Sequence, residues 1–239
     1  MRYACVLMFL AITNFSFCQE GNNPIRKIAI INNSIGERSF VRMGKSDDSQ
    51  VIDTIYVIEF FHVIQDSTSN WWKVFYAGKV GYLNKSEVEI VESMDYLLVK
   101  KMINDIFITQ KELLLQMQIM ICHGEHNSYL LKFLNYYNDN RYRLILSLAS
   151  KFIIEYQDKE LLSNLIDVIA LGIGSADEIQ AYTLGKVAYY LPEETFALVT
   201  SKNSQKLNQY LINSLSMIRS VETIDDITLE ILLQRLKNK

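Results

Sequence analysis

The 239-residue chain has few of the residues that build linkers, disulfide frameworks or polyanion-binding surfaces. It contains two prolines, nine glycines and three cysteines, and 24 Lys and Arg stand against 27 Asp and Glu. A formal net charge of −3 gives no electrostatic reason to expect nucleic acid, so we predict no such partner. No Gly-rich phosphate loop, Gly-x-Ser-x-Gly turn or His-Glu-x-x-His helix occurs, so we predict that the protein is not an enzyme and uses no cofactor.

Residues 1–18 are typical of a secretory signal peptide. Arg2 precedes an apolar run from Tyr3 to Ile12, and the small residues Ser16 and Cys18 stand at positions −3 and −1 relative to Gln19. A membrane anchor is the alternative, but the run is shorter than the ~20 residues needed to cross a bilayer. We therefore predict cleavage after Cys18 and a secreted or periplasmic protein.

A second alternative is a lipid anchor at Cys18, as in bacterial lipoproteins. Phe17 argues against it, because lipoprotein signals have a small residue directly before the cysteine. Cleavage would leave Cys122 as the single thiol, so the mature chain would have no internal disulfide. The richest later apolar segment, Leu113 to Ile121, is too short and too polar to cross a bilayer, so we predict a mature chain that does not span the membrane.

Residues 27–92 have the pattern of a small all-β domain. Their apolar stretches are short and rich in β-branched or aromatic residues, and turn-forming clusters separate them at Gly44 to Ser49 and Asp66 to Asn70. So many short strands in ~65 residues predict a small barrel. The expected strands are Ile28 to Ile31, Phe40 to Arg42, Val51 to Tyr56, Phe60 to Gln65, Trp71 to Tyr76, Lys79 to Leu83 and Glu89 to Val91, with Ala77-Gly78 as a two-residue hairpin connection.

Residues 94–239 have the spacing of an all-α domain. Apolar residues recur three and four positions apart, as in Leu98, Met102 and Ile106. The short connections imply antiparallel neighbours, and the sequence leaves open a compact bundle or a short solenoid of helix pairs. Breaks are expected at Gly124, Asn138 to Asn140, Gly172 to Gly174, Pro192 and Asn203. After a first helix through Ile121, helices are expected at Asn127 to Tyr137, Arg141 to Gln157, Lys159 to Leu171, Ala176 to Leu191, Glu193 to Thr200, Ser204 to Ser220 and Ile227 to Leu236.

The most specific pattern lies in Asn70 to Leu83, which reads N-W-W-K-V-F-Y-A-G-K-V-G-Y-L: tandem tryptophans enter a hairpin that is followed by Gly-Tyr. With Val41-Arg42, the loop Lys45 to Ser49 and the segment Gly81 to Val88, this stretch resembles the bacterial SH3-like domains over about a quarter of the chain. The resemblance implies an SH3-like β-barrel ahead of the helices. It also implies a place at the cell envelope, where members hold peptidoglycan peptides or protein partners.

Alternation along the expected strand places Trp72, Val74 and Tyr76 on one side and Trp71, Lys73 and Phe75 on the other. In the SH3-like family the residue three after the first tryptophan points inward. The resemblance therefore implies that Val74 is core and that Trp71 stands on a binding groove. The alternative is that Trp71 packs under the helices or closes the barrel.

The predicted ligand contacts are Trp71, Tyr82, Asp47, Asp48 and Phe75. An indole, a phenol and an acidic pair would suit a short, partly cationic peptide, and the alternative for the acidic pair is a solvated loop. The chain departs from the proline-binding members of the family, because Asn84 and Glu87 stand where those carry a Pro and a Tyr. Their tyrosine-rich first strand is also not recognisable around Phe40, which puts polyproline recognition in doubt.

Cys122-His123-Gly124-Glu125-His126 is the densest cluster of reactive side chains. Such groups bind zinc when a second pair completes the shell, but the only other histidine, His62, lies in the expected barrel. A polar turn between helices explains the cluster better, and we predict no metal site. Two alternatives to a peptide-binding barrel remain: an adaptor whose helical groove binds a protein while the barrel packs internally, and a hydrolase that uses Cys122 with the neighbouring histidines.

Overall fold

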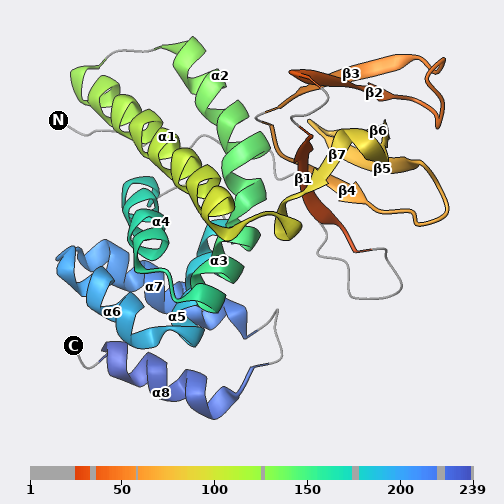
Figure 1. Ribbon diagram of the computed structural model, residues 1–239. Coiled ribbons are helices and arrows are strands. Elements are labelled where there is room, and N and C mark those ends of the chain that lie inside the picture. The colour runs from red at the N-terminus through yellow and green to blue at the C-terminus, as the bar shows by residue number, and fades with distance from the viewer. Residues whose placement is uncertain are drawn as a thin grey trace.

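The computed structural model describes residues 25–32, 36–57, 59–124, 127–173, 178–219 and 224–237, and shows an antiparallel sheet followed by a helical part (Figure 1). The predicted order of all-β then all-α structure is confirmed. The expected signal peptide, with Cys5 and Cys18, lies outside the described residues. In the described ranges, no helix combines the length and apolar character needed to cross a membrane.

The sheet contains all the strands that the sequence predicts, with ends that differ by at most two residues. Every pairing is antiparallel, in the order β3-β2-β6-β5-β4-β1-β7. No ladder joins the edge strands β3 and β7 within the described residues, so the sheet is open where a barrel was predicted. The strands are β1 (Lys27–Ile31), β2 (Arg38–Arg42), β3 (Val51–Tyr56), β4 (Phe61–Ile64), β5 (Trp71–Tyr76), β6 (Lys79–Asn84) and β7 (Val88–Ile90).

The open sheet nevertheless curls around a core of its own. Side chains of the edge strands, Ile55 in β3 and Ile90 in β7, belong to the same buried cluster as Val74 in β5. Gly81 permits the close approach of β2 to β6, because a Cβ there would lie 2.4 Å from Val41 Cγ1. The β5–β6 hairpin turns through Ala77 and Gly78 with φ of 49° and 77°, which is the pair of positive values that a tight two-residue turn requires.

Strand β1 is buried on both faces, which explains its unbroken apolar run. Ala29 and Ile31 belong to the core of the sheet. Ile28 and Ile30 point the other way, into the larger core of the helices, together with Val91. The helices therefore cover the outer face of the sheet at β1 and leave the outer face of the central strands uncovered.

The helices agree with the predicted ranges to within two residues at most ends. The main helix contacts join α3 to α5, α5 to α7, α4 to α6 and α1 to α4, so helices pack on partners two or three places along the chain. Gly185 brings α5 close to α7, because a Cβ there would lie 2.2 Å from the Ser214 carbonyl oxygen. The helices are α1 (Tyr96–His123), α2 (Ser128–Tyr137), α3 (Arg143–Tyr156), α4 (Lys159–Gly172), α5 (Glu178–Tyr190), α6 (Pro192–Ser201), α7 (Gln205–Ile218) and α8 (Asp226–Lys237).

The predicted break at Asn138 to Asn140 is wrong. The chain continues through a π-helical segment, Asn138–Tyr142, that joins α2 to α3. On a regular α-helix, Tyr137 and Tyr142 would lie about 140° apart, since each residue turns the helix by about 100°. The wider π turn brings the two rings toward one face, and both are buried in the helical core.

A buried polar contact ties the sheet to the helices. Glu59 is 6% exposed, and its carboxylate accepts hydrogen bonds from the Tyr56 backbone N–H at 2.8 Å and from the Tyr136 hydroxyl at 3.0 Å. The Arg141 guanidinium lies 3.8 Å from the same carboxylate. The Tyr136 and Tyr76 hydroxyls are 3.4 Å apart, and burial raises the pKa of both tyrosines above the ordinary value. The two parts thus share a polar network as well as an apolar core.

Candidate ligand-binding site

The strand register of β4, β5 and β6 decides which side chains face away from the core. Val63, Val74 and Gly81 are paired across the inner face, where Val74 is fully buried. Ile64, Lys73 and Tyr82 are paired across the outer face. The predicted faces of β5 are therefore confirmed.

The two neighbouring tryptophans have different roles. Trp72 packs at the margin of the sheet core, and its indole N–H donates to the Asp66 carbonyl oxygen at 3.2 Å, which fixes the β4–β5 loop. Trp71 is half-buried on the outer face, opposite Asn84 of β6. Within the described chain, the indole nitrogen of Trp71 has no hydrogen-bond partner. The polar edge of the Trp71 ring is therefore not used within the described chain.

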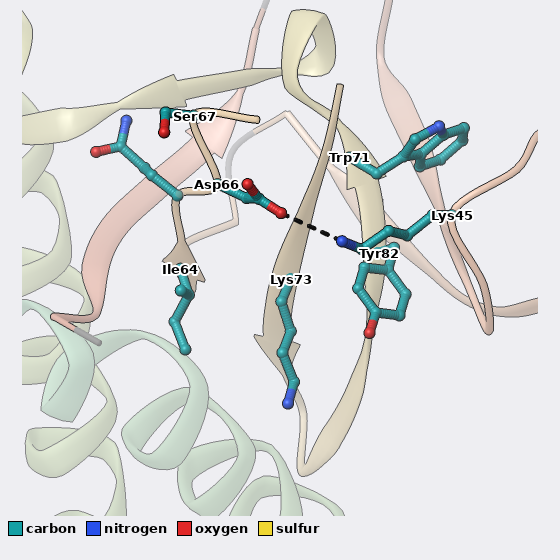
Figure 2. A pocket seen from close by; sticks show the side chains of 8 residues that line it. Lys45, Ile64, Asp66, Ser67, Trp71, Lys73 and Tyr82 are labelled. Atoms are coloured by element: carbon teal, nitrogen blue, oxygen red, sulfur yellow. Dashed lines mark hydrogen bonds and ion pairs between the residues drawn. The ribbon is translucent and has the colours of Figure 1, made fainter. Parts of the chain in front are cut away.

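Trp71 lines a hollow of about 360 Å³ on the outer face. Figure 2 shows Ile64 and Trp71 toward opposite sides of it, with Lys73 and Tyr82 between them. The loops before β3 and after β4 supply the rim. The lining residues are Lys45, Ile64, Gln65, Asp66, Ser67, Trp71, Lys73 and Tyr82.

An ion pair crosses the rim of the hollow. Lys45 Nζ lies 3.2 Å from Asp66 Oδ2 and 5.7 Å from the centre of the Tyr82 ring (Figure 2). The other carboxylate oxygen of Asp66 accepts from the Thr68 hydroxyl at 2.7 Å and from the Thr68 N–H at 2.9 Å. These Thr68 bonds, with Lys45, hold the pKa of Asp66 below its usual value. The Asp66 carboxylate is therefore charged across the physiological pH range, and both of its oxygens have partners in the protein.

The structure brings together two of the five predicted ligand contacts, Trp71 and Tyr82. Asp47, Asp48 and Phe75 do not line the hollow. The Asp47 carboxylate lies 4.0 Å from Arg42 and is mostly exposed, while the Asp48 backbone N–H donates to the Ser46 hydroxyl. The Arg26 guanidinium covers the Phe75 ring at 4.0 Å. All five stay predictions as ligand contacts.

Sequence reasoning missed the charged residues of the hollow, Lys45, Asp66 and Lys73. A signal for Lys73 was present, because it follows Trp71 by two positions and must share its face. A signal for Asp66 was the Asp-Ser-Thr order, in which an aspartate commonly accepts from the backbone two residues on. Neither signal shows which loop folds over the face.

Asn84 and Glu87, which depart from the proline-binding pattern, have a structural role. The Asn84 side chain accepts from the Ser86 N–H at 3.1 Å, and the Glu87 carboxylate accepts from the Asn84 N–H at 3.2 Å. This reciprocal pair caps the single helical turn Lys85–Glu87 between β6 and β7. A single capped helical turn therefore leads directly into the last strand.

The structure describes only part of the Cys122 to His126 cluster. Cys122 is exposed at the end of α1, and the His123 ring lies 2.8 Å from the Ile119 carbonyl oxygen. Glu125 and His126 lie outside the described residues. Among the residues with defined placement, no group of three His, Cys, Asp or Glu is arranged to hold a metal ion.

The sequence matches no protein-family model. No curated protein matches it either. The resemblance to SH3-like domains therefore stays a prediction from the residues of the chain.

Proposed function

We propose that the chain is an exported, non-enzymatic binding protein. Its open, curled sheet, taken as SH3-like, would hold a short peptide of the cell envelope, either a peptidoglycan stem peptide or a protein segment, on a helical scaffold. The observation that carries the proposal is the hollow at Trp71 and Tyr82 on the uncovered outer face of the sheet. An indole whose N–H has no hydrogen-bond partner in the described chain, together with a phenol on the same face, supplies the area and the polar edge that peptide-binding surfaces use.

The SH3-like interpretation gains support from three features of the sheet. Short antiparallel strands curl around one core, two loops meet over the outer face, and a single helical turn precedes the last strand. The capping role of Asn84 and Glu87 argues for a ligand other than a polyproline helix, since that mode needs stacked aromatic walls.

The experiment is capture of envelope material by the full mature chain. Purified sacculi and a solubilised envelope extract are incubated with immobilised wild-type protein and with Trp71→Ala. Tyr56→Ala is the matched control, because Tyr56 is a 50% exposed aromatic residue of β3 that does not line the hollow. We expect Trp71→Ala to lose the captured material and Tyr56→Ala to keep it; equal capture by all three proteins would refute the site.

One observation favours a second candidate, an adaptor that binds a protein through its helices. The α1–α2 hairpin exposes apolar side chains, among them Ile119 at 57% and Phe133 at 43%. In this case Trp71→Ala would capture as much as wild type, whereas Ile119→Ser with Phe133→Ser would capture less. The same set of proteins thus separates the two candidates.

A further inference from the structure

The charges of the hollow do not balance. Lys45 is neutralised by Asp66, and the remaining oxygen of Asp66 is occupied by Thr68. Lys73 is the third charged residue of the lining, and no carboxylate pairs with it among the residues that the structure describes. The hollow therefore carries one uncompensated positive charge.

Lys73 occupies the middle of the outer face. Its cross-strand neighbours are Ile64 and Tyr82, and Figure 2 shows its side chain alongside the Tyr82 ring. Its ammonium lies 5.5 Å from the centre of the Phe75 ring. Lys73 is exposed, and the apolar and aromatic side chains beside it place contact area next to its charge, so a ligand that carries both an anion and an apolar group can use both.

Two further cations, Arg26 and Arg42, lie beside residues of the outer face but outside the lining of the hollow. Arg26 covers Phe75, the next residue on this face of β5. Arg42 is paired with Tyr82 across the sheet, and the nearest carboxylate, that of Asp47, lies 4.0 Å away in an exposed position. Arg26 and Arg42, like Asp47 and Asp48, lie outside the lining, so the uncompensated charge of the hollow itself is that of Lys73.

We infer that the ligand of the hollow is an acidic peptide segment. A carboxylate of the peptide pairs with Lys73, while a neighbouring apolar side chain lies against Trp71 and Tyr82. The inference rests on the proposed function and specifies its ligand. It reverses the charge expected from Asp47 and Asp48, because those carboxylates lie outside the lining. A basic peptide would meet an ammonium with no internal anion to offset it.

The test is a selection from a random peptide library with capped ends, using the full mature chain. Site-dependent peptides are those retained by wild type and not by Trp71→Ala. We expect Asp and Glu to be enriched in them at least ~3-fold over the input, because charge complementarity across an interface selects partners. Lys73→Gln should remove the enrichment, and Lys73→Glu should replace it with an enrichment of Lys and Arg. Lys101→Gln, which removes an exposed charge from α1, should select as wild type does.

The outcomes separate the inference from the function on which it rests. Site-dependent peptides without acidic enrichment, or with an enrichment that survives in Lys73→Gln, would overturn the acidic ligand and leave the peptide site standing. An absence of any Trp71-dependent peptide would overturn both. A selected peptide should also bind roughly 5-fold more weakly when salt is raised from about 50 to about 500 mM, because salt screens exposed ion pairs.

Discussion

The hydroxyl of Tyr136 in α2 donates a 3.0 Å hydrogen bond to the carboxylate of Glu59, 77 residues earlier in the chain. Glu59 is a buried charge at the junction of the sheet and the helices. Its partners come from both parts, so the junction depends on the registration of one part against the other.

Tyr136→Phe should lower the free energy of unfolding by about 1 to 2 kcal/mol, because it removes a hydrogen bond to a buried charged acceptor. Urea denaturation followed by circular dichroism measures the change. Tyr129→Phe removes the hydroxyl of a 78% exposed tyrosine on the same helix and should leave stability unchanged. Equal effects of the two substitutions would show that the bond to Glu59 contributes nothing.

Val74→Ala should destabilise the protein by about 1 to 3 kcal/mol, because Val74 is fully buried in the sheet core. Trp71→Ala should cost less, although it deletes many more atoms, because its ring lies on the outer face. Thermal melts of both variants give the comparison. A larger loss for Trp71→Ala would mean that the indole supports the fold.

The junction should weaken in alkali. Burial raises the pKa of the Tyr76 and Tyr136 hydroxyls, so the stability that their neutral forms contribute is complete below the ordinary tyrosine pKa of about 10. It is lost as the pH rises above that value. Urea midpoints measured from about pH 8 to about pH 11 should fall less steeply for Tyr76→Phe than for wild type. The exposed-site control Tyr129→Phe should follow wild type, and a slope for Tyr76→Phe equal to that of wild type would contradict the assignment.

Gly185→Ala should destabilise the protein by about 2 kcal/mol or more, because the added methyl group would overlap the Ser214 backbone of α7. Gly172→Ala is the matched control, since a Cβ there would meet only ordinary contacts at 3.7 to 3.8 Å. Chemical denaturation of both variants should show a loss for Gly185→Ala alone. Stability equal to that of wild type in both would mean that α5 and α7 separate without cost.

The sequence predicted most of the secondary structure because the two parts have different periodicities. Alternation over Trp71 to Tyr76 and helical spacing after Leu98 are local signals, and tertiary contacts did not override them. The break at Asn138 to Asn140 was predicted wrongly, because polar residues that usually end a helix here form a π turn that the burial of Tyr137 and Tyr142 stabilises.

The candidate site was only partly predictable. Strand alternation places Trp71 and Lys73 on the same face, and the strand register adds Tyr82. The ion pair of Lys45 with Asp66 depends on how two loops fold toward each other, which periodicity does not encode. Asp47 and Asp48 share a loop with Lys45, yet only Lys45 lines the hollow, so the charge of the hollow could not be obtained from loop composition.

The position of β1 has a consequence for synthesis on the ribosome. It is the first described strand to be made, but Ile28 and Ile30 reach their final surroundings only after α3, which contacts β1 and is translated more than a hundred residues later. When all its strands have been translated, the nascent chain therefore still exposes the aliphatic side chains of Ile28 and Ile30 to solvent. Correct folding would then require that these side chains be protected from aggregation until the helices have been synthesised and have packed against β1.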